Sequence, residues 1–129
     1  MGSTGRNTAS NAGNVREPAG LDSSIISNFI SERGLNRGRA LTTLDSKNLG
    51  EQLDNNAKIG DTLITHENGR SVDITKSYEK EADGWHYRRR NESTGELYED
   101  SVESARTVAS DILSTQGTPE PEYWSVRRR

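Results

Sequence analysis

The two histidines are the first residues to consider for chemistry, because imidazole serves both as an acid–base catalyst and as a metal ligand. His66 and His86 belong to one stretch of alternating sequence. That alternation points both side chains to the same outer face but separates them by roughly 25 Å, at about 3.3 Å per strand residue. They can therefore neither share a metal ion nor act as a pair.

Other catalytic patterns are missing from the chain. There is no cysteine, which excludes disulfides, thiolate metal sites and cysteine nucleophiles. No serine stands in a G-x-S-x-G motif. The loop 34–39 has two glycines but lacks the Gly-Lys-Ser/Thr of a phosphate-binding loop. We predict that the protein is not an enzyme and that it uses no cofactor and no metal.

The charge of the chain is concentrated in one part. Residues 59–115 hold twelve acidic and seven basic side chains, a net charge of −5 in a chain of net charge −3. This acidity argues against nucleic-acid binding by general electrostatic attraction. We predict instead that acids near the strand ends and turns contact a basic surface of another protein: Glu79, Glu81, Asp83, Glu96, Glu99 and Asp100.

A short basic run offers an alternative site. Alternation sends His86, Arg88 and Arg90 to the open face of the predicted sheet, where they could contact DNA. The same arginines could instead pair with acids on neighbouring strands, each pair worth only ~0.2–1 kcal/mol. The second interpretation is the favoured one.

The C-terminal tail gives a further candidate. Tyr123 and Trp124 stand between Pro-spaced acids and three terminal arginines, and exposed aromatics beside arginine are typical of interface hot spots. Residues 123–126 could equally add an edge strand to the sheet. The sequence does not decide between the two.

The elements that must position these residues begin with two helices. The first is predicted over 22–33, with Asp22 as cap and with Leu21 packing against Ile26. The second is predicted over 45–54, with Asp45 as cap and Leu44 repeating the staple. Gly50 is unfavourable inside that helix.

From residue 59 the apolar period becomes that of strands. Asn68-Gly69 is a strong hairpin signal, and a two-residue turn there would place Leu63 opposite Ile74, with Thr65 opposite Val72 and Ile59 opposite Tyr78. Asp83-Gly84 predicts a second turn, which brings Trp85 and Tyr87 to the same face. A loop at 93–95, with Gly95 left-handed, adds Leu97 to it.

Asp100-Ser101-Val102-Glu103 is similar to a capping box and predicts a last helix over 101–115 that buries Val102. The predicted fold class is therefore α+β. A three-stranded antiparallel meander over 59–99 carries the last helix on one face and two short helices before it. We expect a disordered arm over 1–20, one domain over 21–117 and a Pro-spaced tail over 118–129.

Two resemblances follow from these patterns. Trp85-His86-Tyr87-Arg88, the turn with Thr94-Gly95 and the helix to Leu113 resemble the integrase-type three-stranded DNA-binding domain. That resemblance implies DNA contacts by Arg88 and Arg90. The Gly/Ser/Asn-rich start is similar to that of small prophage and mobile-element proteins of gut bacteria, which implies a protein that acts by binding.

Together these observations predict a non-enzymatic binding protein of phage or mobile-element origin. Its partner would be a bacterial protein with a basic surface, for example a nuclease complex of host defence that the protein inhibits. DNA binding and a structural or assembly role are the alternatives, and the oligomeric state stays open. We expect a cytoplasmic location, because no apolar run reaches the ~20 residues that span a bilayer and no signal peptide is present.

Overall fold

The computed structural model describes residues 18–67, 71–116 and 122–128, and it confirms the α+β class. Its helices are α1 (Ser23–Glu32), α2 (Thr43–Asn56) and α3 (Ala105–Gln116), with a 3-10 turn η1 (Leu35–Arg37). Its strands are β1 (Thr62–His66), β2 (Ile74–Glu81), β3 (Gly84–Asn91), β4 (Leu97–Glu103) and β5 (Ser125–Arg127).

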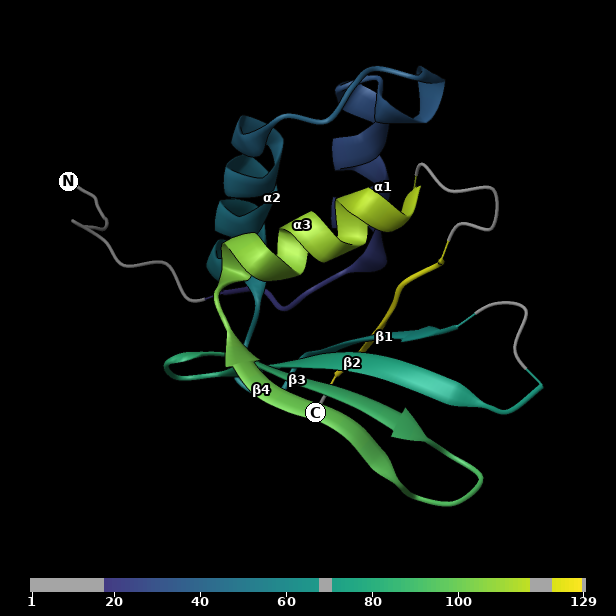
Figure 1. Cartoon of the computed structure of the whole chain (residues 1–129). Helices are drawn as coiled ribbons and strands as arrows, with labels where there is room; N and C mark the ends of the chain where they lie inside the picture. The colour runs from purple at the N-terminus through teal and green to yellow at the C-terminus, as the bar shows by residue number, and fades with distance from the viewer. Residues whose placement is uncertain (1–17, 68–70, 117–121, 129) are drawn as a thin grey trace, which may run out of the picture.

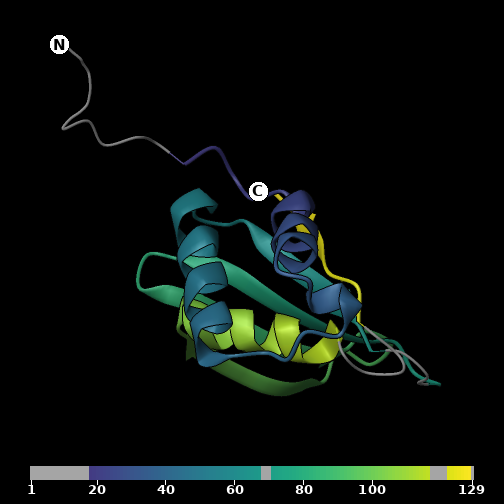
Figure 2. The ribbon, with the colours of Figure 1, turned by 90° about the horizontal axis from the view of Figure 1, so that it is seen from above.

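The strands form one antiparallel sheet in the order β4-β3-β2-β1-β5, so the sheet has five strands where three were predicted. All three helices lie on one side of the sheet, and the opposite face is left open (Figure 1). Seen from above, α3 crosses the sheet beside α2, and α1 lies over the β1 and β5 side (Figure 2). The core fills the layer between the helices and the sheet.

The first helix forms as its sequence predicts. The Asp22 side chain accepts a hydrogen bond from the amide of Ser24 at 2.9 Å, which satisfies one of the free amides at the helix start. Leu21 and Ile26 are both buried, together with Phe29 and Ile30 on the same stripe. The helix therefore lies with one apolar side on the core.

The second helix starts earlier than predicted. Thr42, and not Asp45, is the cap, and the two side chains form a reciprocal capping box in which Asp45 accepts the Thr42 amide. Leu44 is exposed, so the predicted staple with Leu49 does not form. The cap prediction was wrong because threonine and aspartate are both good capping residues. Only the reciprocal hydrogen bonds between Thr42 and Asp45 show which of the two is the cap.

The first hairpin has a longer connection than the predicted two-residue turn. Leu63 lies opposite Tyr78, four positions beyond Ile74, and the chain from 67 to 73 joins the strands. The Asn68-Gly69 signal lies outside the described residues. Because the shift is even, Leu63 keeps its predicted face, but Val72 and Ile59 are exposed and the prediction for them was wrong.

The second hairpin turns at Ala82 and Asp83, with Glu81 opposite Gly84, one position before the predicted turn. Trp85 is fully buried and Tyr87 packs against the core, as predicted. The later loop also follows the prediction, because Gly95 has a left-handed φ of 80°.

The largest error concerns residues 97–103. The predicted helix start at Asp100 is a strand, β4, which pairs with β3 in a register that places Asp100 opposite Arg88. The helix α3 begins at Ala105, where the amide of Thr107 donates to the Ser104 hydroxyl. Val102, predicted to be buried, is 54% exposed, and Leu97 is exposed as well.

Both ends of the described chain join the domain. Gly20, predicted to be in the disordered arm, donates its amide to the Asn56 carbonyl at 2.9 Å; most of that arm, 1–17, lies outside the described residues. In the tail, β5 pairs with β1, and Arg128 donates to the Leu21 carbonyl. Of the two interpretations of residues 123–126, the structure shows an edge strand, which begins two residues later than predicted and covers Ser125–Arg127.

Candidate interaction surface

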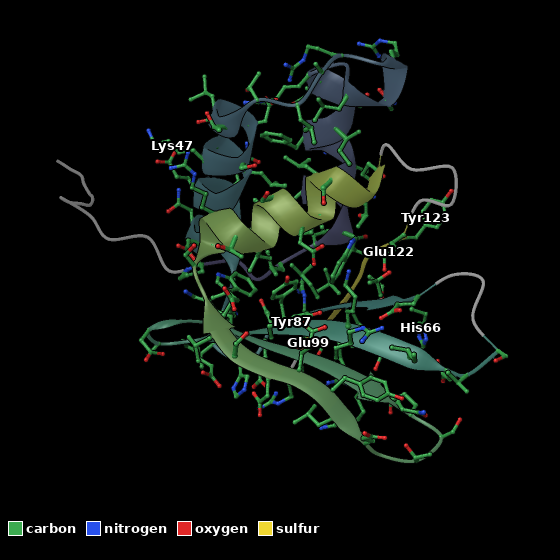
Figure 3. All side chains as sticks on the ribbon, viewed as in Figure 1. Lys47, His66, Tyr87, Glu99, Glu122 and Tyr123 are labelled. Carbon is green, nitrogen blue, oxygen red and sulfur yellow. The ribbon has the colours of Figure 1, made fainter. Side chains whose placement is uncertain are left out.

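The predicted acidic residues do not form one patch, but they gather around the β3–β4 side of the sheet. Glu79, Glu81 and Asp100 extend from the open face, as their register with β3 shows. Asp83 and Glu96 lie in the two turns that flank β3, and both are exposed. Glu99 points to the other face, toward the helices, where Figure 3 places it near Tyr87.

His86 of β3 lies on the open face, next to the edge strand, between two carboxylates. Its Nδ1 lies 3.1 Å from the Glu81 carboxylate, and its Nε2 is hydrogen-bonded to Asp100. The hydrogen bond with Asp100 raises the pKa of His86, the bond with Glu81 adds to this, and burial and the nearby Arg88 oppose it. The described residues hold no group of three His, Cys, Asp or Glu side chains arranged to bind a metal.

The arginines of the alternative DNA site are placed as predicted but are not a uniform positive stripe. Arg88 Nη1 lies 3.3 Å from the Glu79 carboxylate, and its Nη2 lies 3.2 Å from His86 Nδ1. Arg90 is exposed on the same face. With Glu79, Glu81 and Asp100 interleaved among the cations, this face would repel much of a phosphate backbone. The cross-strand pairing favoured from the sequence is therefore present for Arg88.

The helix-facing side of the sheet carries a second polar network, which includes Asp111 in the middle of α3. The Tyr78 hydroxyl donates to Asp111 at 2.8 Å, and Lys76 Nζ lies 3.1 Å from Glu122 and 3.4 Å from Asp111. Burial raises the pKa of Tyr78, and the Asp111 carboxylate raises it further. These contacts tie the sheet to α3 and to the tail, so they serve the fold.

Arg89 connects β3 to Glu67, just after β1, and to Tyr98 of β4 on this side. Its guanidinium forms a two-pronged ion pair with Glu67 and lies over the Tyr98 ring, 5.3 Å from the centroid. Glu99 is 3.8 Å from the same guanidinium, and its carboxylate remains half exposed. Glu99 is therefore partly neutralised and still accessible.

The two aromatic candidates of the tail separate. Trp124 is buried, with its ring 5.7 Å from that of Tyr78, and so it is part of the core and not an exposed contact. Tyr123 is 76% exposed, and Figure 3 shows it beside Glu122, away from the β3–β4 side. Of these two aromatic residues, Tyr123 alone therefore remains a candidate for an interface contact.

A shallow pocket of about 260 Å³ lies between the first turns of α2 and α3. Its lining consists of hydroxyl groups and one guanidinium: Thr43, Ser46, Arg106, Thr107 and Ser110. None of these lining residues is a histidine or a carboxylate that could activate a hydroxyl as a nucleophile. The pocket thus offers polar contacts without a nucleophile–base pair.

The feature that the sequence did not reveal is the strand β4 itself. It is the outermost strand on its side of the sheet (Figure 1). It presents Leu97, Tyr98 and Val102, all exposed large apolar side chains, among the acids Glu96, Glu99, Asp100 and Glu103. The spacing of Asp100 and Glu103 matches a capping box, and it pointed to a helix start in these residues.

Comparison with known proteins gives no match, whether with a family model, a curated protein or a solved structure. Among the described helices none combines the length and the apolar composition needed to cross a membrane. The functional argument therefore depends on the surface alone.

Proposed function

We propose that this chain is a non-catalytic binding protein whose acidic β3–β4 side engages a basic surface of another protein. The observation that carries the proposal is the composition of β4 and its preceding turn. Four acids and three exposed apolar side chains lie there with no lysine or arginine between residues 96 and 103. Charge around an apolar centre is the usual arrangement of a specific interface.

The combination of acidic and apolar side chains on β4 and its preceding turn favours a protein over a nucleic acid as partner. Opposite charges speed association and select the partner, while the apolar groups supply burial. DNA binding through the open face is disfavoured, because Glu79 and Asp100 lie beside the arginines that would contact phosphate. The resemblance to small prophage proteins supports a bacterial partner, and nucleic-acid-handling complexes fit because their surfaces are rich in lysine and arginine.

The proposal is tested by reversing charge at two positions and comparing with a matched control. Glu96→Lys/Glu99→Lys changes the acidic edge, and Glu32→Lys/Glu51→Lys makes the same change in net charge on exposed sites of α1 and α2. The immobilised full chain is presented to bacterial lysate at increasing salt, which screens ionic contacts over about 10 Å at 0.1 M.

We expect a retained protein that salt releases, that the edge variant fails to retain and that the control variant retains normally. Retention that survives Glu96→Lys/Glu99→Lys, or that the control variant loses equally, would contradict the proposal. A protein bound equally by both variants would place the interface elsewhere.

A further inference from the structure

The second edge of β4 is unpaired within the described part of the chain, and β4 is much longer than the strand at the opposite edge. It has seven residues and pairs only with β3, whereas β5 has three. An edge strand exposes a row of backbone donors and acceptors that another extended segment can use. Such an edge is a template for strand addition.

The hydrogen bonds of the sheet show which way each backbone group points. Lys80 of β2 donates its amide to Asp61, and its carbonyl accepts from Gly60, so its backbone faces the β1 side. Successive residues of an antiparallel strand direct these groups to opposite sides. The backbone groups of Glu79 therefore face β3.

The same alternation carries across to β4. Glu79 lies opposite His86, so His86 faces β2 and the next residue, Tyr87, faces β4. Tyr87 lies opposite Ser101, whose backbone groups are thus used within the sheet. The amides and carbonyls of its neighbours, Asp100 and Val102, point away from the sheet toward solvent.

We infer that this free edge takes up an extended basic segment of the partner as an additional strand. The inference rests on the proposed function and names its mode of binding. Side chains of an added strand would lie beside Glu99 and Glu103 on the helix side and beside Asp100 on the open face. Opposite charges in such positions stabilise pairing. We expect an aliphatic side chain of the added strand beside Val102.

A second copy of the chain fits this edge less well. Two β4 strands paired antiparallel about Asp100 would set that carboxylate against itself, and like charges directly opposite destabilise a pair. The basic edge strand β5 of another copy is only three residues long, and its neighbour Arg128 is held by the Leu21 carbonyl. A basic segment from a different protein meets neither obstacle.

The probe for this test is a labelled peptide, Thr-Arg-Val-Thr-Arg-Arg-Thr, capped at both ends. In antiparallel orientation its arginines face Glu103, Asp100 and Glu99, and its valine faces Val102. Two N-methylated forms of the peptide keep its charge and its side chains. The first form is methylated at the two amides opposite Val102 and Asp100, which would donate to β4. The second form is methylated at two amides that alternate with these and would point away from β4. Binding to the full chain is followed by fluorescence anisotropy.

Strand addition requires that the two methylated peptides differ. Two lost hydrogen bonds correspond to about a tenfold to hundredfold weaker binding of the first form, with the second close to the unmodified peptide. Equal affinities would show ionic attraction without strand pairing, and no binding of any form would show that charges on this edge only keep chains apart. Either result overturns the inference.

A substitution in the protein gives an independent readout. Val102→Pro removes an amide that points outward, a position that proline tolerates in an edge strand, and Val102→Ala retains the amide while shortening the side chain. We expect the peptide to be lost with proline and kept with alanine, circular dichroism being unchanged in both. If a lysate partner remains sensitive to Glu96→Lys/Glu99→Lys but not to Val102→Pro, the proposed function stands and strand addition does not. Self-association in sedimentation that Val102→Pro abolishes would assign the edge to a second copy.

Discussion

Gly50 of α2 lies so close to Ala105 of α3 that a Cβ atom on Gly50 would stand 3.0 Å from the Ala105 carbonyl. A glycine inside a helix costs about 1 kcal/mol relative to alanine. Here the bare backbone lets α2 approach the start of α3, which follows directly after β4. The contact thus sets the position of the helix layer relative to the acidic edge.

Replacing Gly50 by alanine should destabilise the protein despite the better helix propensity. The new Cβ meets backbone that cannot move without shifting α3, and overpacking of this kind costs about 1–3 kcal/mol. Urea denaturation measures the loss. Asn55→Ala, at an exposed position of the same helix, is the control and should gain a few tenths of a kcal/mol. A more stable Gly50→Ala variant would refute the close contact.

Asp61 joins the start of α1 to the sheet and should tolerate asparagine better than alanine. The buried carboxylate accepts the amides of Leu21 and Lys58 on one oxygen, Oδ2, each at 2.9 Å. Asp61→Ala leaves both amides without an acceptor, at a cost of about 2–4 kcal/mol. In Asp61→Asn the single carbonyl oxygen can accept both. Equal losses in the two variants, measured by urea denaturation, would contradict this.

The helix α1 and the faces of the first three strands could be predicted from the sequence, because each depends on local patterns that agree. Asp22 and Leu21 mark one helix start, and the period of two sorts Leu63 and Trp85 to the buried side. The register of the first hairpin was wrong by four residues, yet the faces survived because the shift was even.

The strand β4 could not be read from local patterns. Asp100 and Glu103 satisfy the spacing of a capping box, and nothing nearby shows that the segment pairs with β3. Tertiary pairing decided against the local signal, and the real cap, Ser104, lies four residues later. The acids Glu96, Glu99 and Asp100 were predicted as contacts, but the edge that carries them was not, since an edge strand is a property of the whole sheet.

The grouping around His86 depends on the same long-range pairing. Glu81 reaches His86 across the β2–β3 turn, and Asp100 reaches it from β4. The sequence placed His86 and Arg88 on the open face, as the structure does, but it gave no sign that two carboxylates hold the imidazole. Consecutive acids also separate, with Glu99 and Asp100 on opposite faces.

Tyr78 should not ionise near its ordinary pKa of 10.0 in the folded protein. Burial raises its pKa, and the Asp111 carboxylate adds to the effect. Tyr78→Phe should therefore leave the tyrosinate absorbance step near pH 10 unchanged in the native protein. In urea the same substitution removes one of four tyrosines from that step. A smaller step in the native variant would show that Tyr78 ionises freely.

The raised pKa of Tyr78 also makes stability depend on alkaline pH. The neutral phenol is the form that the fold favours, so its contribution is complete below pH 10 and is lost as the pH rises above it. The unfolding free energies of wild type and Tyr78→Phe should hence converge on the alkaline side. A difference between the two unfolding free energies that widens above pH 10 would contradict this prediction.

His86 should make the protein more stable on the acidic side of neutrality. An imidazolium donates from both nitrogens at once, so the bonds with Asp100 and Glu81 favour the protonated form and raise the pKa above 6.5. The contribution of a group with a raised folded pKa is complete below its unfolded pKa and is lost as the pH rises through the folded one. The stability difference between wild type and His86→Gln should accordingly be largest below pH 6.5 and shrink as the pH rises through the raised pKa of His86.

Asp100→Asn provides the matched test of the cause. It removes the carboxylate that raises the pKa of His86 most, while an amide oxygen can still accept the hydrogen bond. Titration of the His86 ring by NMR should show a lower pKa in this variant than in wild type, and urea denaturation should show a flatter pH dependence. An unchanged pKa would mean that Asp100 does not hold the proton on His86. A stability difference between wild type and His86→Gln that grows with pH would contradict the donor role of the imidazolium.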